Sequence, residues 1–304
     1  MVGDANRWMF MIPPLQFNMW KIAVGQLCDG GNGWLIVQTY GKEFVGSIPS
    51  HHTEGTLELW TDFRILGCSI TQRSLLQKHY VRSLFDSIAY RYDLLNHLLS
   101  GGIDLYWRRR AMEQLLTLQP KRILDVATGT ADFAIAALRL HPTHVVGVDI
   151  AEEMLAVGRA KLQKRGLGAT VALQTGEAEQ LQFDAESFDA AIVAFGARNF
   201  ENLEKGLSEM RRVLRPGGKI VVLEFSRPRH FPFRQLYFFY FLNILPFVGR
   251  LVSKSKDAYT YLPDTVMKFP DGKDFLGILQ RVGFTETTEE RLTFGIASIY
   301  IGTK

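Results

Sequence analysis

The chain has 304 residues, of which 47% are hydrophobic and 22% are charged, so it is long enough to bury a globular core of ordinary size. Its net charge of +4 comes without a long run of lysine and arginine, which argues against a protein that follows nucleic-acid phosphates. Cys28 and Cys68 have neither a disulfide-framework nor a zinc-ligand spacing, so no metal site is predicted and a reducing, intracellular setting is expected. No apolar run reaches the roughly 20 residues that a membrane-spanning helix needs.

Residues 1–70 differ from the rest of the chain. They are rich in turn-forming residues and show no sustained apolar period. We therefore predict a poorly ordered N-terminal extension, for which an over-called start of the reading frame is one explanation. A small β-rich cap is the alternative.

From Val81 onward the chain is well patterned. Apolar residues at helical spacing predict a helix through VRSLFDSIAYRYDLLNHLL, and a second helix is predicted at 106–116. Strands and helices then alternate: the predicted strands are 122–126, 145–148, 170–174, 190–195 and 219–224, and the predicted helices lie near 131–140, 152–164 and 203–214. The RPGGK run at 215–219 is expected to end the last helix. This alternation predicts a mainly parallel sheet, and residues 282–304 predict two closing strands, interpreted as antiparallel.

The stretch ILDVATGTADFA, at 123–134, is typical of a buried strand, a short turn and the start of a helix. Asp125 lies near the carboxyl end of the strand, where ligands bind in doubly wound sheets. Gly129 permits a sharp turn and Thr130 flanks the helix start, but the G-x-G-x-x-G spacing of a dinucleotide site is missing. Asp125 and Asp132 would repel a pyrophosphate and attract an ammonium group. The stretch therefore favours a nucleoside cofactor with a positively charged amino-acid end over NAD.

Two later landmarks support a nucleoside cofactor. Asp149 lies at the end of the second predicted strand. Its separation from Asp125 along the sequence is close to the spacing at which a carboxylate binds the two hydroxyls of a ribose. The loop at 175–183 follows the third strand, and its Glu177 and Ala178 are candidate contacts to an adenine ring. A single Asp at a strand end is often a helix cap or turn former, so the hypothesis depends on the landmarks together.

Together these residues resemble the class I S-adenosylmethionine-dependent methyltransferases and, more narrowly, the UbiE/MenG family of quinone-biosynthesis C-methyltransferases. The resemblance covers residues 81–304 and is carried by FDSIAYRYDLLNHLLSGGIDLYWRR (85–109), VDIAEEML (148–155), FGARNF (195–200), RVLRPGGKIVVLEFSRP (212–228) and YTYLPDTVMKFPDG (259–272). It implies an α/β fold, a class I methyltransferase (Rossmann-like) three-layer sandwich with a mainly parallel seven-stranded sheet and an antiparallel last strand. That domain would span 71–304 and carry a lid or substrate insertion at 230–270.

The resemblance implies S-adenosylmethionine-dependent C-methylation of a prenylated quinol ring, such as demethylmenaquinol to menaquinol, in menaquinone or ubiquinone biosynthesis. The family's cofactor contacts fall on Thr130, Asp149, Glu177 and Ala178, whereas Ala194 replaces a hydroxyl residue that the family often has. One alternative is a methyltransferase of the same fold with another small lipophilic substrate. Another is a non-catalytic, cofactor-binding scaffold of a quinone-biosynthesis complex. A nucleic-acid methyltransferase is disfavoured because the chain has neither an N/D-P-P-Y/F tetrapeptide nor a Pro-Cys nucleophile.

The implied chemistry needs a group that stabilises a phenolate, because a ring carbon becomes nucleophilic when the neighbouring phenol loses its proton. Arg198, in FGARNF, is the predicted cation, and Tyr92, Asp93 and His97 are candidates for moving the proton. The alternatives are an ion pair of Arg198 with a nearby carboxylate, a cap or surface role for Asp93, and a core histidine at position 97.

The aromatic segment at 231–253, FPFRQLYFFYFLNILPFVGRLVS, has no charge between Arg234 and Arg250. It is too short and too interrupted to span a bilayer. We predict a lid helix that shelters an isoprenoid tail and rests on the inner face of the membrane, in an otherwise cytoplasmic protein. The alternative is a buried core helix or a homodimer contact.

Overall fold

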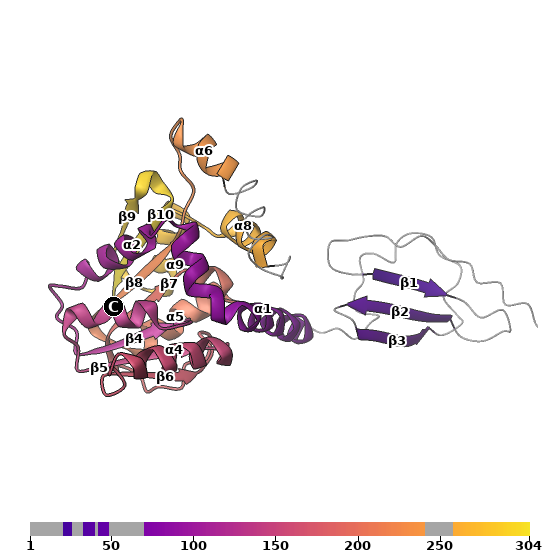
Figure 1. The fold of residues 1–304 in the computed structure, drawn as a ribbon, viewed down its shortest axis with the longest axis horizontal. Coiled ribbons are helices and arrows are strands. Elements are labelled where there is room, and N and C mark those ends of the chain that lie inside the picture. The colour runs from indigo at the N-terminus through magenta and orange to yellow at the C-terminus, as the bar shows by residue number, and fades with distance from the viewer. Residues whose placement is uncertain (1–20, 26–32, 40–41, 49–69, 241–257) are drawn as a thin grey trace, which may run out of the picture. The chain divides into compact units, whose positions relative to one another are not determined.

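The computed structural model describes the backbone of residues 21–25, 33–39, 42–48, 70–240 and 258–304 (Figure 1). The chain divides into two compact units, Met1–Ser69 and Ile70–Lys304. In the first, the strands β1 (Lys21–Gly25), β2 (Gly33–Thr39) and β3 (Lys42–Ile48) form an antiparallel sheet in that order. The disorder and the domain limits predicted for residues 1–70 stay predictions.

The second unit is built on a seven-stranded sheet with the order β6-β5-β4-β7-β8-β10-β9. Its strands are β4 (Arg122–Val126), β5 (His144–Asp149), β6 (Val171–Thr175), β7 (Phe188–Ala194), β8 (Leu214–Phe225), β9 (Thr285–Leu292) and β10 (Ala297–Thr303). The strands from β6 to β8 in this order are parallel, and β10 runs antiparallel to both β8 and β9. The α/β fold, the mainly parallel sheet and the antiparallel last strand are therefore confirmed.

Helices cover both faces of this sheet. The described helices of this unit are α1 (Ile70–Leu99), α2 (Ile103–Glu113), α3 (Asp132–Ala137), α4 (Glu152–Lys164), α5 (Leu203–Val213), α6 (Phe233–Phe239), α8 (Ala258–Lys268) and α9 (Lys273–Val282), with short 3-10 turns η4 (Leu138–Leu140), η5 (Ala197–Asn199) and η7 (Thr293–Gly295). Two apolar clusters result: Ile123 of β4 packs with α2 and α3, and the next residue, Leu124, packs with α5 and α9. Strands buried on both faces explain the apolar runs in the sequence.

The RPGGK run follows the end of the helix before it, as expected, but it belongs to a strand that starts at Leu214, whereas the predicted strand starts at Lys219. Helix α5 ends at Val213, and β8 includes the whole run. The chain's last residue, Lys304, pairs with it: its N–H donates to Gly218 O and its C=O accepts from Gly217 N, both at 2.9 Å. Hydrogen bonds to the far end of the chain, which a local pattern cannot anticipate, extend the strand.

The segment between β8 and α9 contains α6 and α8 (Figure 1). Tyr237 of α6 and Val266 of α8 belong to one buried apolar cluster. Most of the predicted lid helix at 231–253 lies outside the described residues, because the structure describes nothing between 240 and 258. Among the helices that it does describe, none combines the length and the apolar character needed to cross a bilayer.

Candidate active site

The turn after β4 and the end of β5 form the base of the candidate site. These strands are neighbours and parallel, so their carboxyl ends meet at one edge of the sheet. Asp149 joins them: Oδ2 accepts the N–H of Gly129 at 2.8 Å and Oδ1 accepts the N–H of Ala151 at 2.9 Å. Gly129 has φ of 55°, a conformation that glycine adopts without strain. Burial raises the pKa of Asp149, and these backbone hydrogen bonds oppose that rise.

Asp125 lies beneath this turn with no exposed surface. One oxygen, Oδ2, accepts the hydroxyl of Thr128 at 2.6 Å, and Oδ1 has no hydrogen-bond partner among the described residues. Burial raises the pKa of Asp125 to about 7, against the lowering effect of the Thr128 hydrogen bond. Thr130 is also buried, and its hydroxyl donates to Asp93 of α1 at 2.5 Å.

A cavity opens above Asp149 at this edge of the sheet. Four predicted site residues line it, namely Gly129, Asp149, Ala178 and Tyr92. In the part of the chain that the structure describes, the remaining predicted residues do not belong to this lining: Asp93, Asp125, Thr130, Glu177 and Arg198.

Helix α1 forms one wall of the cavity through Val81, Phe85 and Tyr92. Nearer the start of that helix, Lys78 joins a cluster of carboxylates: its Nζ lies 2.7 Å from Glu177 Oε2 and 3.2 Å from Glu201 Oε2. Burial acts to lower the pKa of Lys78, but the hydrogen bonds to these two carboxylates raise it above its usual value. Glu177 is therefore engaged by α1, whereas its neighbour Ala178 faces the cavity.

The FGARNF segment forms another part of the wall, and Arg198 lies just behind it. Its Nη1 donates to Glu224 Oε1 at 2.8 Å and to the Phe195 carbonyl, while its backbone N–H donates to Glu224 Oε2 at 3.3 Å. Glu224 has no exposed surface, so the ion pair that the sequence left as an alternative is present. The Nε of Arg198 is buried and has no hydrogen-bond partner among the described residues.

Tyrosines gather around Arg198. Burial raises the pKa of Tyr92, Tyr237 and Tyr261, and in each case the positive charge of Arg198 opposes the rise. The Tyr261 hydroxyl donates to Asn199 Oδ1 at 3.1 Å, which ties α8 to the FGARNF segment. A buried cation therefore stands among phenols beside the cavity.

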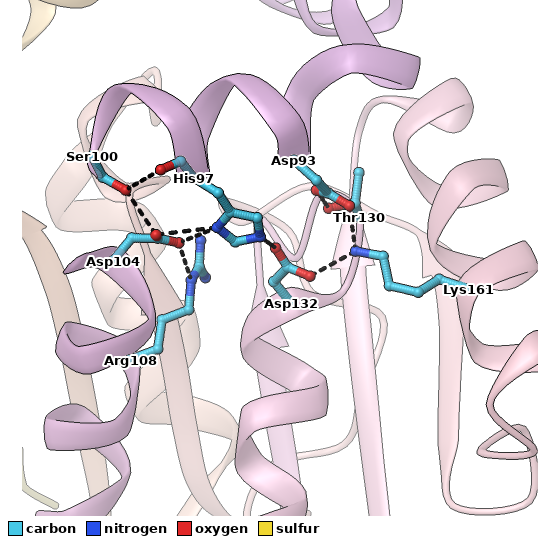
Figure 2. A network of polar contacts seen from close by, with 8 residues as sticks. All are labelled: Asp93, His97, Ser100, Asp104, Arg108, Thr130, Asp132 and Lys161. Carbon is cyan, nitrogen blue, oxygen red and sulfur yellow. Dashed lines mark hydrogen bonds and ion pairs between the residues drawn. The ribbon is translucent and has the colours of Figure 1, made fainter. Parts of the chain in front are cut away.

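Asp93 does not face this cavity. Its carboxylate accepts the Thr130 hydroxyl and pairs with Lys161 Nζ at 2.6 Å (Figure 2). His97, one turn further along α1, bonds through Nδ1 to Asp104 at 2.9 Å. Roles for Asp93 and His97 in proton movement stay predictions, and the contacts of both side chains connect α1 to neighbouring helices.

Sequence reasoning missed three residues that hold this arrangement together. Glu224 carried a usable signal, a carboxylate at the carboxyl end of a predicted strand, the same signal that identified Asp125 and Asp149. Lys161 and Lys78 carried no such signal, because a lysine on a helix is normally a solvated residue and their partners lie far along the chain.

The geometry can be compared with known proteins. The model of the ubiE/COQ5 methyltransferase family matches residues 73–304. A demethylmenaquinone methyltransferase of Bacteroides fragilis is 48% identical over 74% of this chain and 92% of its own length. The ubiquinone/menaquinone biosynthesis C-methyltransferase UbiE of Geobacter sulfurreducens is 43% identical over 82% of this chain and 98% of its own length.

Solved structures share the fold at low sequence identity. A SAM-dependent methyltransferase of Thermotoga maritima, described as a possible histamine N-methyltransferase, has a TM-score of 0.51 and 22% identity, covering 73% of this chain and 99% of its own. The [4+2]-cyclase SpnF has a TM-score of 0.53 and 16% identity, covering 74% of this chain and 94% of its own. These likenesses concern the fold, whereas the family match and the identities to the named relatives establish kinship. The chain therefore belongs to the ubiE/COQ5 methyltransferase family.

Proposed function

We propose that the chain transfers a methyl group from S-adenosylmethionine to a ring carbon of a prenylated quinol, converting demethylmenaquinol to menaquinol or performing the matching step toward ubiquinone. The names of its relatives support this reaction. The observation that carries it is a single cavity lined both by the turn at Gly129 and Asp149 and by the FGARNF segment in front of Arg198. Donor and acceptor would then lie side by side, which is the main requirement of a displacement reaction.

The residues around the turn fit the cofactor. A carboxylate offers about four acceptor positions, and Asp149 uses two of them on backbone N–H groups, which leaves capacity for two ribose hydroxyls. Gly129 allows close approach at the turn, and Ala178 lines the cavity on the side where adenine is expected. When bound, S-adenosylmethionine supplies an electrophilic methyl group on a sulfonium.

Arg198 and Tyr92 would prepare the quinol. Arginine stays protonated, so Arg198 would act as a stabilising cation rather than a base. Its Nε, which has no hydrogen-bond partner among the described residues, would be the donor to a quinol oxygen. Its buried position strengthens that attraction. A tyrosine hydroxyl keeps its proton at neutral pH, and burial raises the pKa of Tyr92 further, so Tyr92 could donate a hydrogen bond to the developing phenolate.

Transfer of tritiated methyl from S-adenosylmethionine to demethylmenaquinol tests the proposal with the full chain. Arg198→Met should lower kcat about 100-fold, since the cation acts on charge that develops in the transition state. Its affinity for S-adenosylmethionine should stay within about threefold. Arg215→Met is the matched control, because Arg215 also pairs with a carboxylate but is half exposed on β8.

Arg198→Met leaves the Glu224 carboxylate buried alone, which can unfold the protein. The double variant R198M/E224Q removes both charges and separates loss of fold from loss of chemistry. Wild-type turnover in that double variant would remove Arg198 from the mechanism. Absence of labelled quinone with the wild-type protein would reject quinol methylation and leave the scaffold alternative.

We further propose that the protein contacts an anionic membrane surface, where its substrate is dissolved. The proposed contact, called the aromatic surface here, consists of exposed apolar side chains on and beside α6 and at η7: Phe231, Phe233, Leu236, Phe239 and Phe294. Phe233 stacks on Phe294 with ring centroids 3.8 Å apart, which joins the two elements. Residues 226–240 include arginines but no carboxylate, which suits negatively charged lipid. A cytoplasmic location at the inner face of the membrane and a homodimer stay predictions.

A further inference from the structure

A network of charged side chains connects four helices behind the turn that follows β4 (Figure 2). Lys161 of α4 stands at its centre, with Nζ 2.6 Å from Asp93 Oδ2 and 2.6 Å from Asp132 Oδ1. Asp93 belongs to α1 and Asp132 is the first residue of α3. One ammonium group therefore joins three helices.

Helix α1 contributes two side chains to this network from the same face. Asp93 and His97 are four residues apart and so lie one above the other along the helix. Asp93 accepts the hydroxyl of Thr130, and the Nε2 of His97 lies 3.6 Å from Asp132 Oδ2. Both contacts fall on the 130–132 segment, which continues directly from Gly129 in the cavity lining.

At α2 the network ends in a carboxylate, Asp104, that has several hydrogen-bond and ion-pair partners. The Asp104 carboxylate accepts hydrogen bonds from His97 Nδ1 at 2.9 Å and from the Ser100 hydroxyl at 2.8 Å. The Nε of Arg108 lies 3.6 Å from it. Burial would raise the pKa of Asp104, but the hydrogen bonds from His97 and Ser100 and the charge of Arg108 hold it below its usual value. Asp104 therefore holds the His97 side chain in place.

Lys161 is the member whose loss would matter most. Its side chain is 16% exposed, and those of Asp93 and Asp132 are 27% and 19% exposed, so water screens the three charges only in part. Without the ammonium, the carboxylates of Asp93 and Asp132, each of which lies 2.6 Å from Lys161 Nζ, would face each other with no cation between them. Two like charges so close together repel. Helix α1 would then be pushed from the turn.

We propose that Lys161 is a positioning residue for the cofactor: it holds α1 against the turn after β4 and thereby sets the cavity wall formed by Val81, Phe85 and Tyr92. Lys161 acts through Asp93, Asp132 and Thr130 and does not itself line the cavity, as far as the structure describes it. The identity of the ligand rests on the proposed function, but the contact between α1 and the turn does not.

Calorimetric titration of S-adenosylmethionine into the full chain measures the effect. Lys161→Met should weaken binding about tenfold, and Lys161→Arg should recover at least half of the loss in log Kd because the positive charge is kept. Lys164→Met, at an exposed position on the same helix, is the matched control and should bind like the wild type. In turnover with quinol, Lys161→Met should raise the KM for S-adenosylmethionine in proportion and keep kcat within about twofold.

Hydrogen exchange of the ligand-free protein gives a readout that needs neither cofactor nor activity. Backbone amides at 88–99 of α1 should exchange at least threefold faster in Lys161→Met than in the wild type or in Lys164→Met. Should Lys161→Met not fold, the double variant D93N/K161M takes its place: it has lost the ion pair that holds α1 but not gained the carboxylate repulsion, so both changes should keep their direction and be smaller.

Unchanged affinity or unchanged exchange in the folded Lys161 variant would overturn the proposal, and so would a fall in kcat without a rise in KM. A wild-type protein that binds no S-adenosylmethionine would reject the proposed function instead. The exchange comparison would then still decide whether Lys161 holds α1.

Discussion

At the scale of single residues, Asp125 shows how burial turns a carboxyl group into a pH-dependent term in stability. It has no exposed surface, one oxygen without a partner among the described residues, and a pKa raised to about 7 in the folded protein against 3.8 in a free chain. Between these two pH values the folded protein holds a proton that the unfolded chain has released. The free energy of unfolding therefore falls as pH rises from 3.8 to about 7, and this contribution is constant at higher pH.

Asp125→Asn should remove this decline, because an amide does not titrate. Between pH 5 and pH 7 the slope of the free energy of unfolding against pH should become more positive than in the wild type, by at most about 1.4 kcal/mol per pH unit. Urea unfolding at a series of pH values measures it, with Asp184→Asn, at an exposed position, as the control. Parallel curves for Asp125→Asn and the wild type would show that Asp125 is already ionised at pH 5.

At the scale of elements, glycines set how closely the strands and turns approach. Gly147 lies in β5, and a Cβ built there would be 2.6 Å from Leu173 Cδ2 and 2.7 Å from Thr128 Oγ1. The Thr128 hydroxyl is the donor to Asp125, so the packing of β5 reaches the turn of the candidate site.

Gly147→Ala should therefore lower the free energy of unfolding by about 1–3 kcal/mol, the usual cost of forcing an extra carbon into a packed core. Gly168→Ala is the matched control, because a Cβ at Gly168 meets nothing within 4 Å among the described residues. Both variants share the entropic effect of replacing glycine in the unfolded chain, so their difference isolates the clash. Chemical unfolding measures both, and equal stabilities would mean that Leu173 and Thr128 move aside without cost.

The accuracy of sequence-based prediction also varies by element. The α4 helix was predicted with its observed limits, and β4 likewise, because the apolar residues of both are buried in the core of this unit and so follow the local helix or strand pattern. The start of α1 at Ile70 was missed, and so was the strand character of RPGGK, which depends on hydrogen bonds to Lys304. In the candidate site, Asp149 and Gly129 were predictable from strand order, whereas the partners of Lys161 and Lys78 come from segments far apart in the sequence.

At the scale of the whole molecule, the candidate site and the aromatic surface belong to the same unit, residues 70–304, although α6 and η7 come from distant parts of its sequence. Exposed side chains here include Phe231 at 80% and Phe294 at 65%, which is unusual for large aromatic residues in a protein surrounded by water. The proposed contact with lipid would explain why the described residues leave these aromatic side chains uncovered.

The wild-type chain should co-float with vesicles that contain phosphatidylglycerol, and less so at high salt, since part of the attraction comes from arginines. Phe231→Ser with Leu236→Ser should reduce the bound fraction at least tenfold. Leu116→Ser, at an exposed position between α2 and β4, should bind like the wild type. Vesicle binding that survives the double substitution would place the membrane contact elsewhere, and no binding by the wild type would reject it.

The ion pair between Arg198 and Glu224 also limits how this protein can diverge. Either residue changed alone to an uncharged one leaves the other as an isolated charge at a position with almost no access to water. During evolution, replacement of this pair by uncharged residues therefore requires either an unstable single mutant as an intermediate or simultaneous substitution of both residues. We expect a selection for stability, applied to random libraries, to recover the two positions as a coupled pair even when methyl transfer is not selected at all.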